Sequence, residues 1–263
     1  MYFHHFCFRQ GRLKGLDKDT FLLPGEVLED LQLAGMKILQ KTTGFRFSMD
    51  AVLLADFARM GSHDRVVDFG TGTGILPLLL LGRGKGLSYD AFEIQSDMAD
   101  MCRRTMACNH VSDRIHVHCM DVREAHTVLG YEKTDHIICN PPFGQPGCSL
   151  VNPSPEKAVA RHLGEDGLLP WLQEGFRLLR GHGRFSMIYP AERMLQAMEQ
   201  MDSVHLTPKR FRLIYPGPDR AANLVLIEAQ KNAKPLLHTE PPLMVRDGDG
   251  NESEEIRRIY HLA

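Results

Sequence analysis

The chain has 263 residues, of which 43% are hydrophobic and 24% are charged, and its formal net charge is −2. These values are typical of a globular protein with one sizeable core and argue against a protein that coats nucleic acid without specificity. No apolar run reaches the ~20 residues that span a bilayer, and the first residues lack the order of a secretory signal, so we expect a cytoplasmic protein that does not enter a membrane.

The six cysteines include no CxxC pair. Several of them fall in stretches that we expect to be buried, which favours reduced thiols over a disulfide framework. The cluster of His4, His5 and Cys7 is not completed by a second cluster elsewhere in the chain. We therefore expect no bound metal ion.

The sequence divides into four parts. Residues 1–30 are expected to be an N-terminal extension, and residues 31–263 are expected to form one domain. Within that domain we distinguish a lead-in (31–62), a core (63–232) and a C-terminal tail (233–263). A hairpin is expected through Leu31–Gln40 and Phe45–Met49, followed by a helix over Asp50–Met60 that Ser48 or Asp50 caps.

Short apolar strands alternate with helical segments from residue 65 onward. The predicted strands are Arg65–Phe69, Leu87–Ile94, Ile115–Met120, His136–Asn140, Arg184–Tyr189, Phe211–Tyr215 and Asn223–Ala229. The predicted helices between them are Ile75–Leu81, Asp97–Asn109, Leu168–Arg180 and Glu192–Met201. Only Pro216–Ala222 separates the last two strands, which is too short for a crossover helix and predicts an antiparallel hairpin. The pattern indicates an α/β fold with a Rossmann-like, doubly wound, mainly parallel sheet of seven strands ending in a C-terminal antiparallel hairpin.

A glycine-rich turn follows the first core strand. Asp68 precedes the run Gly70-Thr71-Gly72-Thr73-Gly74, which leads directly into an apolar helix. Alternating glycines let a ligand approach the backbone, and helix N–H groups favour an anion such as the carboxylate of a methionine moiety. The DxGxGxG pattern resembles the S-adenosyl-L-methionine loop of class I methyltransferases, whereas a nicotinamide enzyme would carry GxGxxG.

Two further acids stand at the ends of the next two strands. Glu93 can accept hydrogen bonds from both hydroxyls of a ribose, and Asp121 is expected within reach of an adenine amino group. Ile94 and Val122, which follow them, are assigned to the same cofactor site. Because parallel strands end at one edge of a sheet, these residues should surround one S-adenosyl-L-methionine molecule.

The tetrapeptide Asn140-Pro141-Pro142-Phe143 follows the fourth strand. An amino group on an sp² carbon is a poor nucleophile because its lone pair is delocalised. If the Asn140 side-chain oxygen and the Pro141 carbonyl accept its two hydrogens, the lone pair is aimed at the methyl group to be transferred. Proline has no N–H, which keeps this edge rigid, and Phe143 offers a face for a planar substrate. We predict these four residues as catalytic, with Asn140 also beside the cofactor.

This arrangement suits adenine N6, guanine N2 and the glutamine amide, so other segments must decide between them. The run Gly44-Phe45-Arg46-Phe47-Ser48-Met49-Asp50-Ala51-Val52-Leu53-Leu54-Ala55 closely resembles the lead-in of bacterial tRNA1(Val) (adenine(37)-N6)-methyltransferases. Further matches are Phe92-Glu93-Ile94-Gln95, Ala160-Arg161-His162 and Pro208-Lys209-Arg210-Phe211-Arg212. The resemblance runs from about residue 25 to the end, with Leu163 standing where an acid is expected.

The resemblance implies a class I methyltransferase that methylates N6 of the tRNA adenosine 3′ of the anticodon. Guanine-N2 methylation of RNA and N5 methylation of protein glutamine stay open as alternatives. Candidates for contacts with RNA phosphates are Arg161, His162, Lys209, Arg210 and Arg212, although each of them could equally be an ordinary surface charge. We expect tRNA as the partner and a monomer, with a dimer left open.

Overall fold

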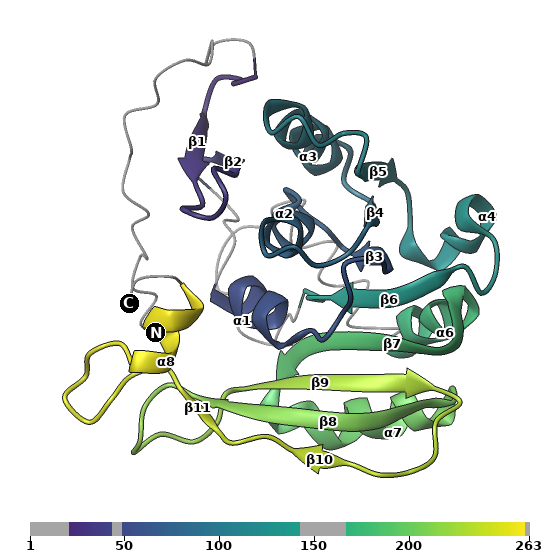
Figure 1. Cartoon of the computed structure of the whole chain (residues 1–263), viewed down its shortest axis with the longest axis vertical. Coiled ribbons are helices and arrows are strands. Elements are labelled where there is room, and N and C mark those ends of the chain that lie inside the picture. Colours follow the sequence, from purple (N-terminus) through teal and green to yellow (C-terminus); the bar gives the residue numbers. More distant parts are fainter. Residues whose placement is uncertain (1–20, 44–48, 143–166, 261–263) are drawn as a thin grey trace, which may run out of the picture.

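The computed structural model describes residues 21–43, 49–142 and 167–260 of the chain. Its core strands are β3 (Arg65–Phe69), β4 (Ser88–Glu93), β5 (Ile115–Cys119), β6 (Thr134–Cys139), β7 (Leu179–Pro190), β8 (Leu206–Tyr215) and β9 (Leu224–Lys231). Two short strands follow them, β10 (His238–Thr239) and β11 (Leu243–Met244). All nine belong to one sheet with the order β10-β8-β9-β7-β6-β3-β4-β5, in which β11 also pairs with β8 (Figure 1).

The sheet is parallel from β5 to β7, antiparallel on both sides of β9, and parallel again where β10 and β11 pair with β8. β3 pairs in parallel with β4 and β6, whereas β9 runs antiparallel to both β7 and β8. The seven predicted strands and the terminal hairpin are therefore confirmed. The short strands β10 and β11 were not predicted, because two residues carry no periodic pattern that could reveal a strand.

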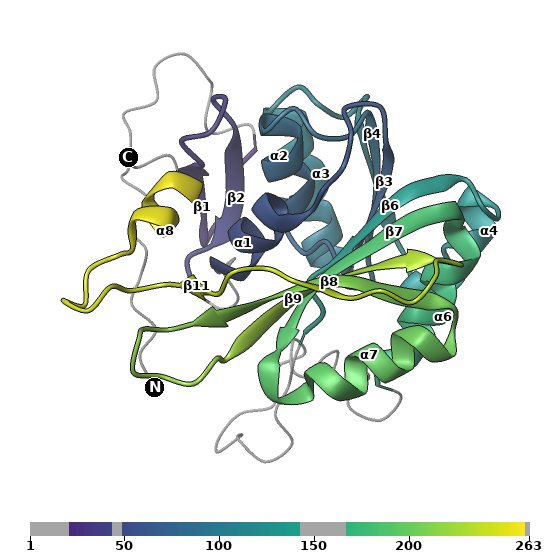
Figure 2. The same cartoon turned by 60° about the horizontal axis from the view of Figure 1, so that its bottom comes forward.

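Helices cover both faces of the sheet, as the doubly wound fold requires. Their bounds are α1 (Met49–Phe57), α2 (Ile75–Gly82), α3 (Ser96–Cys108), α4 (His126–Leu129), α6 (Leu169–Leu178), α7 (Met194–Ser203) and α8 (Glu254–Ile259), with 3₁₀ turns η2 (Val122–Glu124) and η3 (Ala191–Arg193). Figure 2 shows α1, α2 and α3 on one side of the sheet and α4, α6 and α7 on the other. Each side has its own apolar cluster.

The hairpin that precedes the core lies in a different place from the one predicted, and its first strand falls in the expected N-terminal extension (1–30). Its strands are β1 (Glu26–Asp30) and β2 (Lys37–Lys41), and Leu28 faces Leu39 in their register. The expected strand Leu31–Gln40 is wrong because its first half forms the turn, where Gln32, Ala34 and Gly35 all have positive φ. The expected second strand, Phe45–Met49, falls largely outside the described residues.

Helix α1 begins at Met49, which places Asp50 inside the first turn. Asp50 is therefore not the N-cap, and the alternative cap, Ser48, lies outside the described residues. The predicted helix Asp50–Met60 also ends early, at Phe57. Its apolar residues Ala51, Val52, Leu53, Leu54 and Ala55 are all buried, because α1 packs against α2, β7 and α8.

Within the described ranges, no helix is long and apolar enough to cross a membrane. The same residues hold no group of three or more His, Cys, Asp or Glu side chains that is arranged to bind a metal ion. Cys102, Cys108, Cys119 and Cys139 are free thiols, and Cys7 and Cys148 lie outside the described residues.

Candidate active site

The glycine turn and the Asn140 motif leave neighbouring strands at the same level. In the register of β3 and β6, Phe69 faces Cys139, so Gly70 and Asn140 are the next residues on adjacent parallel strands. Strands in a sheet lie about 4.8 Å apart, which makes these two residues near neighbours. The strand order reverses between β3 and β6, and in open α/β sheets ligands bind at such a switch point.

Glycine is needed at all three alternating positions of the turn. Gly70, Gly72 and Gly74 have φ values of 71°, 58° and 88°, a region that other L-residues enter only with strain. Packing adds a second requirement at Gly74, where a Cβ atom would lie 2.7 Å from Cys102 Sγ. The turn is thus held tightly against α3, and α2 begins directly after it.

Asp68 lies behind the turn with both carboxylate oxygens buried. Neither oxygen makes a well-formed hydrogen bond to a described residue, and the same is true of the Thr71 hydroxyl oxygen. Burial raises the pKa of Asp68 to about 7; the neighbouring Thr71 hydroxyl opposes this shift, and the nearby Glu93 adds to it. Unsatisfied buried polar atoms are rare in folded proteins, and three of the four such side-chain atoms among the described residues lie at the turn where a polar ligand is predicted.

Glu93 joins the glycine turn to the end of β4. The Gly72 amide donates a hydrogen bond of 3.0 Å to Glu93 Oε2, and the Gln95 amide donates one of 2.9 Å to Oε1. Burial raises the pKa of Glu93, although these two amide donors oppose the shift. Each carboxylate oxygen can accept a further hydrogen bond, as binding of a ribose would require.

The remaining cofactor candidates lie at the ends of β4 and β5. Ile94 is 49% exposed and Val122 is buried. Asp121 caps η2 by accepting a hydrogen bond from the Arg123 amide, and its carboxylate also binds the Arg123 guanidinium at 2.6 Å. An adenine amino group that binds Asp121, as predicted, would therefore share the carboxylate with the Arg123 guanidinium.

The side chain of Asn140 is half-buried, and no described residue is hydrogen-bonded to it. Pro141 is buried and Pro142 is exposed, so the chain reaches the surface two residues after Asn140. Phe143, the predicted stacking residue, lies outside the described residues.

The predicted RNA contacts on β8 turn out to be engaged with the protein. Arg210 is only 5% exposed, and its guanidinium binds Glu228 and Glu240 while lying over the Phe57 ring. Arg212 binds Glu255 at 2.7 Å, and Lys209 donates to the Lys234 carbonyl. Arg210 is therefore a buried structural cation. Arg161 and His162 lie outside the described residues.

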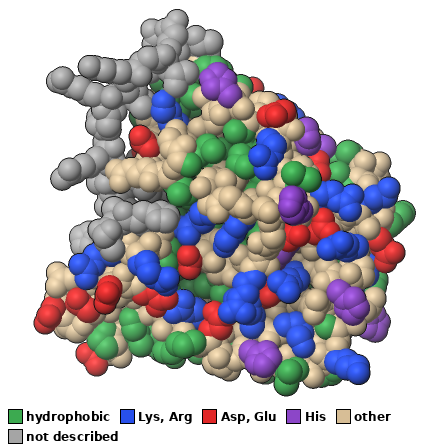
Figure 3. All heavy atoms as spheres, viewed as in Figure 1, with side chains coloured by type: hydrophobic (Ala, Val, Ile, Leu, Met, Phe, Trp, Pro, Cys, Tyr) green, Lys and Arg blue, Asp and Glu red, His purple; other side chains and the backbone are tan. Residues whose placement is uncertain are grey.

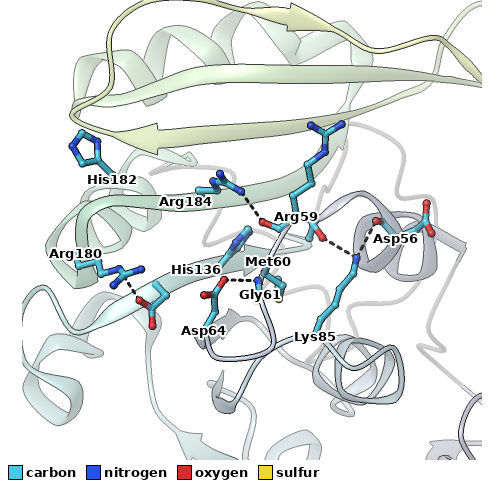
Figure 4. A pocket seen from close by; sticks show the side chains of 12 residues that line it. Asp56, Arg59, Met60, Gly61, Asp64, Lys85, His136, Arg180, His182 and Arg184 are labelled. Carbon is cyan, nitrogen blue, oxygen red and sulfur yellow. Dashed lines mark hydrogen bonds and ion pairs between the residues drawn. The ribbon is translucent and has the colours of Figure 1, made fainter.

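A polar hollow of about 590 Å³ lies at the opposite edge of the sheet, near the starts of β3 and β6 (Figure 4). Its charged groups are engaged with the fold: Lys85 donates to the Ala55, Asp56 and Ala58 carbonyls at the end of α1, and Arg180 binds Asp135. Burial lowers the pKa of Lys85 to about 8. Figure 3 shows Lys and Arg side chains gathered over β7, β8 and β9, with acidic side chains among them.

Comparison with known proteins identifies the family. A family model described as "Methyltransferase small domain" matches residues 49–169. A tRNA1(Val) (adenine(37)-N6)-methyltransferase from Parabacteroides distasonis is 30% identical over 188 residues, which cover 71% of this chain and 78% of that protein. The chain belongs to the tRNA1(Val) (adenine(37)-N6)-methyltransferase family. A second member of this family, from Trichodesmium erythraeum, is 27% identical over 76% of this chain and 83% of its own length.

The solved structure of a predicted O-methyltransferase from Agrobacterium tumefaciens has the same fold as this member of the tRNA1(Val) (adenine(37)-N6)-methyltransferase family. The TM-score is 0.65 at 23% identity, over 81% of this chain and 96% of that one. As a member of its family the chain is a methyltransferase, and its methyl donor is S-adenosyl-L-methionine. The unsatisfied atoms of Asp68 and Thr71 fit such a polar ligand, and the three glycines of the turn leave its backbone accessible.

Proposed function

We propose that this methyltransferase transfers a methyl group from S-adenosyl-L-methionine to the exocyclic N6 of an adenine in tRNA, at the anticodon-loop adenosine 3′ of the anticodon. The observation that carries the proposal is the placement of Asn140 beside Gly70 on adjacent parallel strands. It brings a donor-binding turn and an amide oxygen to one point of the sheet edge. The names of the curated relatives support adenine N6 over the other amines.

Different residues of the proposed donor site bind different parts of the cofactor. In this proposal the glycine turn and Asp68 hold the methionine end, Glu93 accepts hydrogen bonds from the ribose hydroxyls, and Ile94 and Val122 flank the adenine. When bound, S-adenosyl-L-methionine supplies an electrophilic methyl group on a positively charged sulfur.

Asn140 and Pro141 act on the target amine. The Asn140 side-chain oxygen and the Pro141 carbonyl accept its two hydrogens, which fixes the nitrogen and turns its lone pair toward the methyl group. No strong base is needed, because the nitrogen becomes acidic once it is methylated and can then lose a proton to water. Phe143 is proposed to stack on the extruded base.

Contacts with RNA outside the pocket are proposed for Lys209, Arg161 and His162. A cation that neutralises an RNA phosphate releases counterions, which gives affinity without reading the sequence. Arg210 and Arg212 are left out of this set because their largely buried guanidinium groups bind Glu228 and Glu255. Activity on tRNA fits a cytoplasmic enzyme.

The identity of the product tests this function. The purified enzyme would be incubated with labelled S-adenosyl-L-methionine and an unmodified tRNA1(Val) transcript, followed by mass spectrometry of the nucleosides. A matched transcript would carry purine riboside, which lacks the amino group, in place of the adenosine 3′ of the anticodon. We expect N6-methyladenosine from the first transcript and none from the second. Formation of N2-methylguanosine, or labelling of release-factor glutamine in a parallel reaction, would refute the proposal.

A further inference from the structure

Trp171 is the single tryptophan of the sequence, and it lies in the first turn of α6. The residues on either side fix the helix to the sheet: Leu168 is 2% exposed and Leu172 is fully buried. Pro170, at the start of the helix, restricts its backbone further. The indole itself is only half-buried, so a large aromatic surface is held rigidly but not fully covered.

The indole lies against the start of the glycine turn. Its ring meets the Phe69 ring edge-on, with the centroids 6.1 Å apart and an interplanar angle of 85°. A Cβ atom on Gly70 would lie 3.2 Å from Cη2 and 3.5 Å from Cζ3 of the same indole. Trp171 therefore occupies the space on one side of Gly70, at the position where the chain leaves β3 and enters the turn.

We propose that Trp171 is a positioning residue for the methyl donor, because it holds Gly70 in the conformation that the donor site requires. This inference rests on the proposed role of the glycine turn in binding S-adenosyl-L-methionine. A glycine at φ 71° has no side chain of its own to restrict it, so the neighbouring indole limits its movement. A turn that is ordered before the donor arrives loses less conformational entropy on binding.

The position of α6 gives the contact a second consequence. Trp171 joins the first turn of α6 to the start of the glycine turn, and Asn140 leaves the adjacent strand at the level of Gly70. Loss of the indole should therefore weaken donor binding and also misplace the donor relative to Asn140. A displacement of about 1 Å can lower a rate by ~100-fold, so kcat should fall as well as affinity.

The test combines the fluorescence of Trp171 with donor affinity measured by equilibrium dialysis of labelled S-adenosyl-L-methionine. Because no other tryptophan exists in the chain, the wild-type emission should change on titration with S-adenosyl-L-methionine and saturate at the dialysis Kd. Trp171→Ala should raise Kd by about 10-fold, which corresponds to ~1.4 kcal/mol. Trp171→Phe keeps an aromatic ring and should stay within about 3-fold of the wild type.

Phe176, on the same helix, provides the matched control. Its ring packs under Lys231 at the far end of α6, with 4.3 Å between Lys231 Nζ and the ring centroid. Phe176→Ala should lower the melting temperature without changing the donor Kd. The inference would be overturned by an unchanged donor Kd in Trp171→Ala, or by wild-type Trp171 emission that does not change when the donor binds. Either result would leave the proposed function intact. Failure of the wild type to bind S-adenosyl-L-methionine by dialysis would overturn both.

Discussion

Met106 of α3 occupies the space that a side chain at Gly74 would need. A Cβ atom at Gly74 would overlap the Met106 methyl group and lie 2.7 Å from Cys102 Sγ. Side chains of α3 therefore fill the space beside Gly74 at the end of the turn, while the Trp171 ring fills the space beside Gly70 at its start. The helix after the second core strand therefore restricts the glycine turn, which is the proposed donor site.

This packing predicts how glycine substitutions at the two ends of α2 differ. Gly74 and Gly84 both have positive φ, but nothing lies within 4 Å of a Cβ atom at Gly84. Each alanine substitution should cost about 1–2 kcal/mol for the left-handed backbone. Gly74→Ala should cost a further ~1–3 kcal/mol because it overpacks the core. Urea unfolding of the two variants measures the difference, and equal losses would show that α3 yields to the added methyl group.

The buried carboxyl of Asp68 predicts a pH dependence of stability. Burial raises the pKa of Asp68 from 3.8 to about 7, so between these values the folded protein keeps a proton that the unfolded chain has lost. The stability contributed by this proton is fully present below pH 3.8 and is lost as the pH rises to about 7. Asp68→Asn removes the titration, so the free energy of unfolding of the variant relative to the wild type should rise across this window. A difference that stays constant with pH would contradict the assignment.

Because Arg210 and Glu228 form a buried ion pair, we expect the loss of Arg210 to lower the free energy of unfolding. Arg210→Ala leaves Glu228 buried without its cation, which should cost about 3–5 kcal/mol of unfolding free energy. The tRNA affinity of the molecules that remain folded should not change.

For Lys209, on the same strand, we expect the opposite result: an effect on tRNA affinity and almost none on stability. Lys209→Ala should leave the melting temperature nearly unchanged, lower tRNA affinity, and reduce the slope of log affinity against log salt by about 1. Filter binding at several salt concentrations measures this slope. An Arg210→Ala protein that folds normally and loses the salt dependence would reverse the two roles.

The parallel core of the fold could be predicted from the sequence because its strands are short apolar runs separated by helices. The strand Arg65–Phe69 was predicted with its observed bounds. The β1–β2 hairpin was misplaced because all five residues of β1 are only half-buried and show no clear alternation. Its register depends on pairing and on the turn at Gln32–Gly35, which the apolar pattern does not encode.

The placement of candidate site residues could be predicted only where a motif stands at a strand end. Gly70 and Asn140 were expected to be neighbours because parallel strands bring their ends to one edge, and their strands have that register. The burial of Arg210 depends on Glu228, eighteen residues away on β9, and on Phe57 in α1, and no local pattern reveals such partners. The contact of Trp171 with Gly70 could not be predicted for the same reason, because it joins segments far apart in the chain.

The most direct test of the account separates methyl transfer from donor binding in Asn140→Ala. Single-turnover transfer to unmodified tRNA1(Val) would be followed with labelled S-adenosyl-L-methionine, and donor affinity would be measured on the same preparation. Because Asn140 is assigned to the amine and lies beside the donor turn, the transfer rate should fall by at least ~100-fold while the donor Kd stays within about 3-fold. A wild-type transfer rate, or a loss of donor binding as large as the loss of rate, would contradict the placement of the target amine at Asn140.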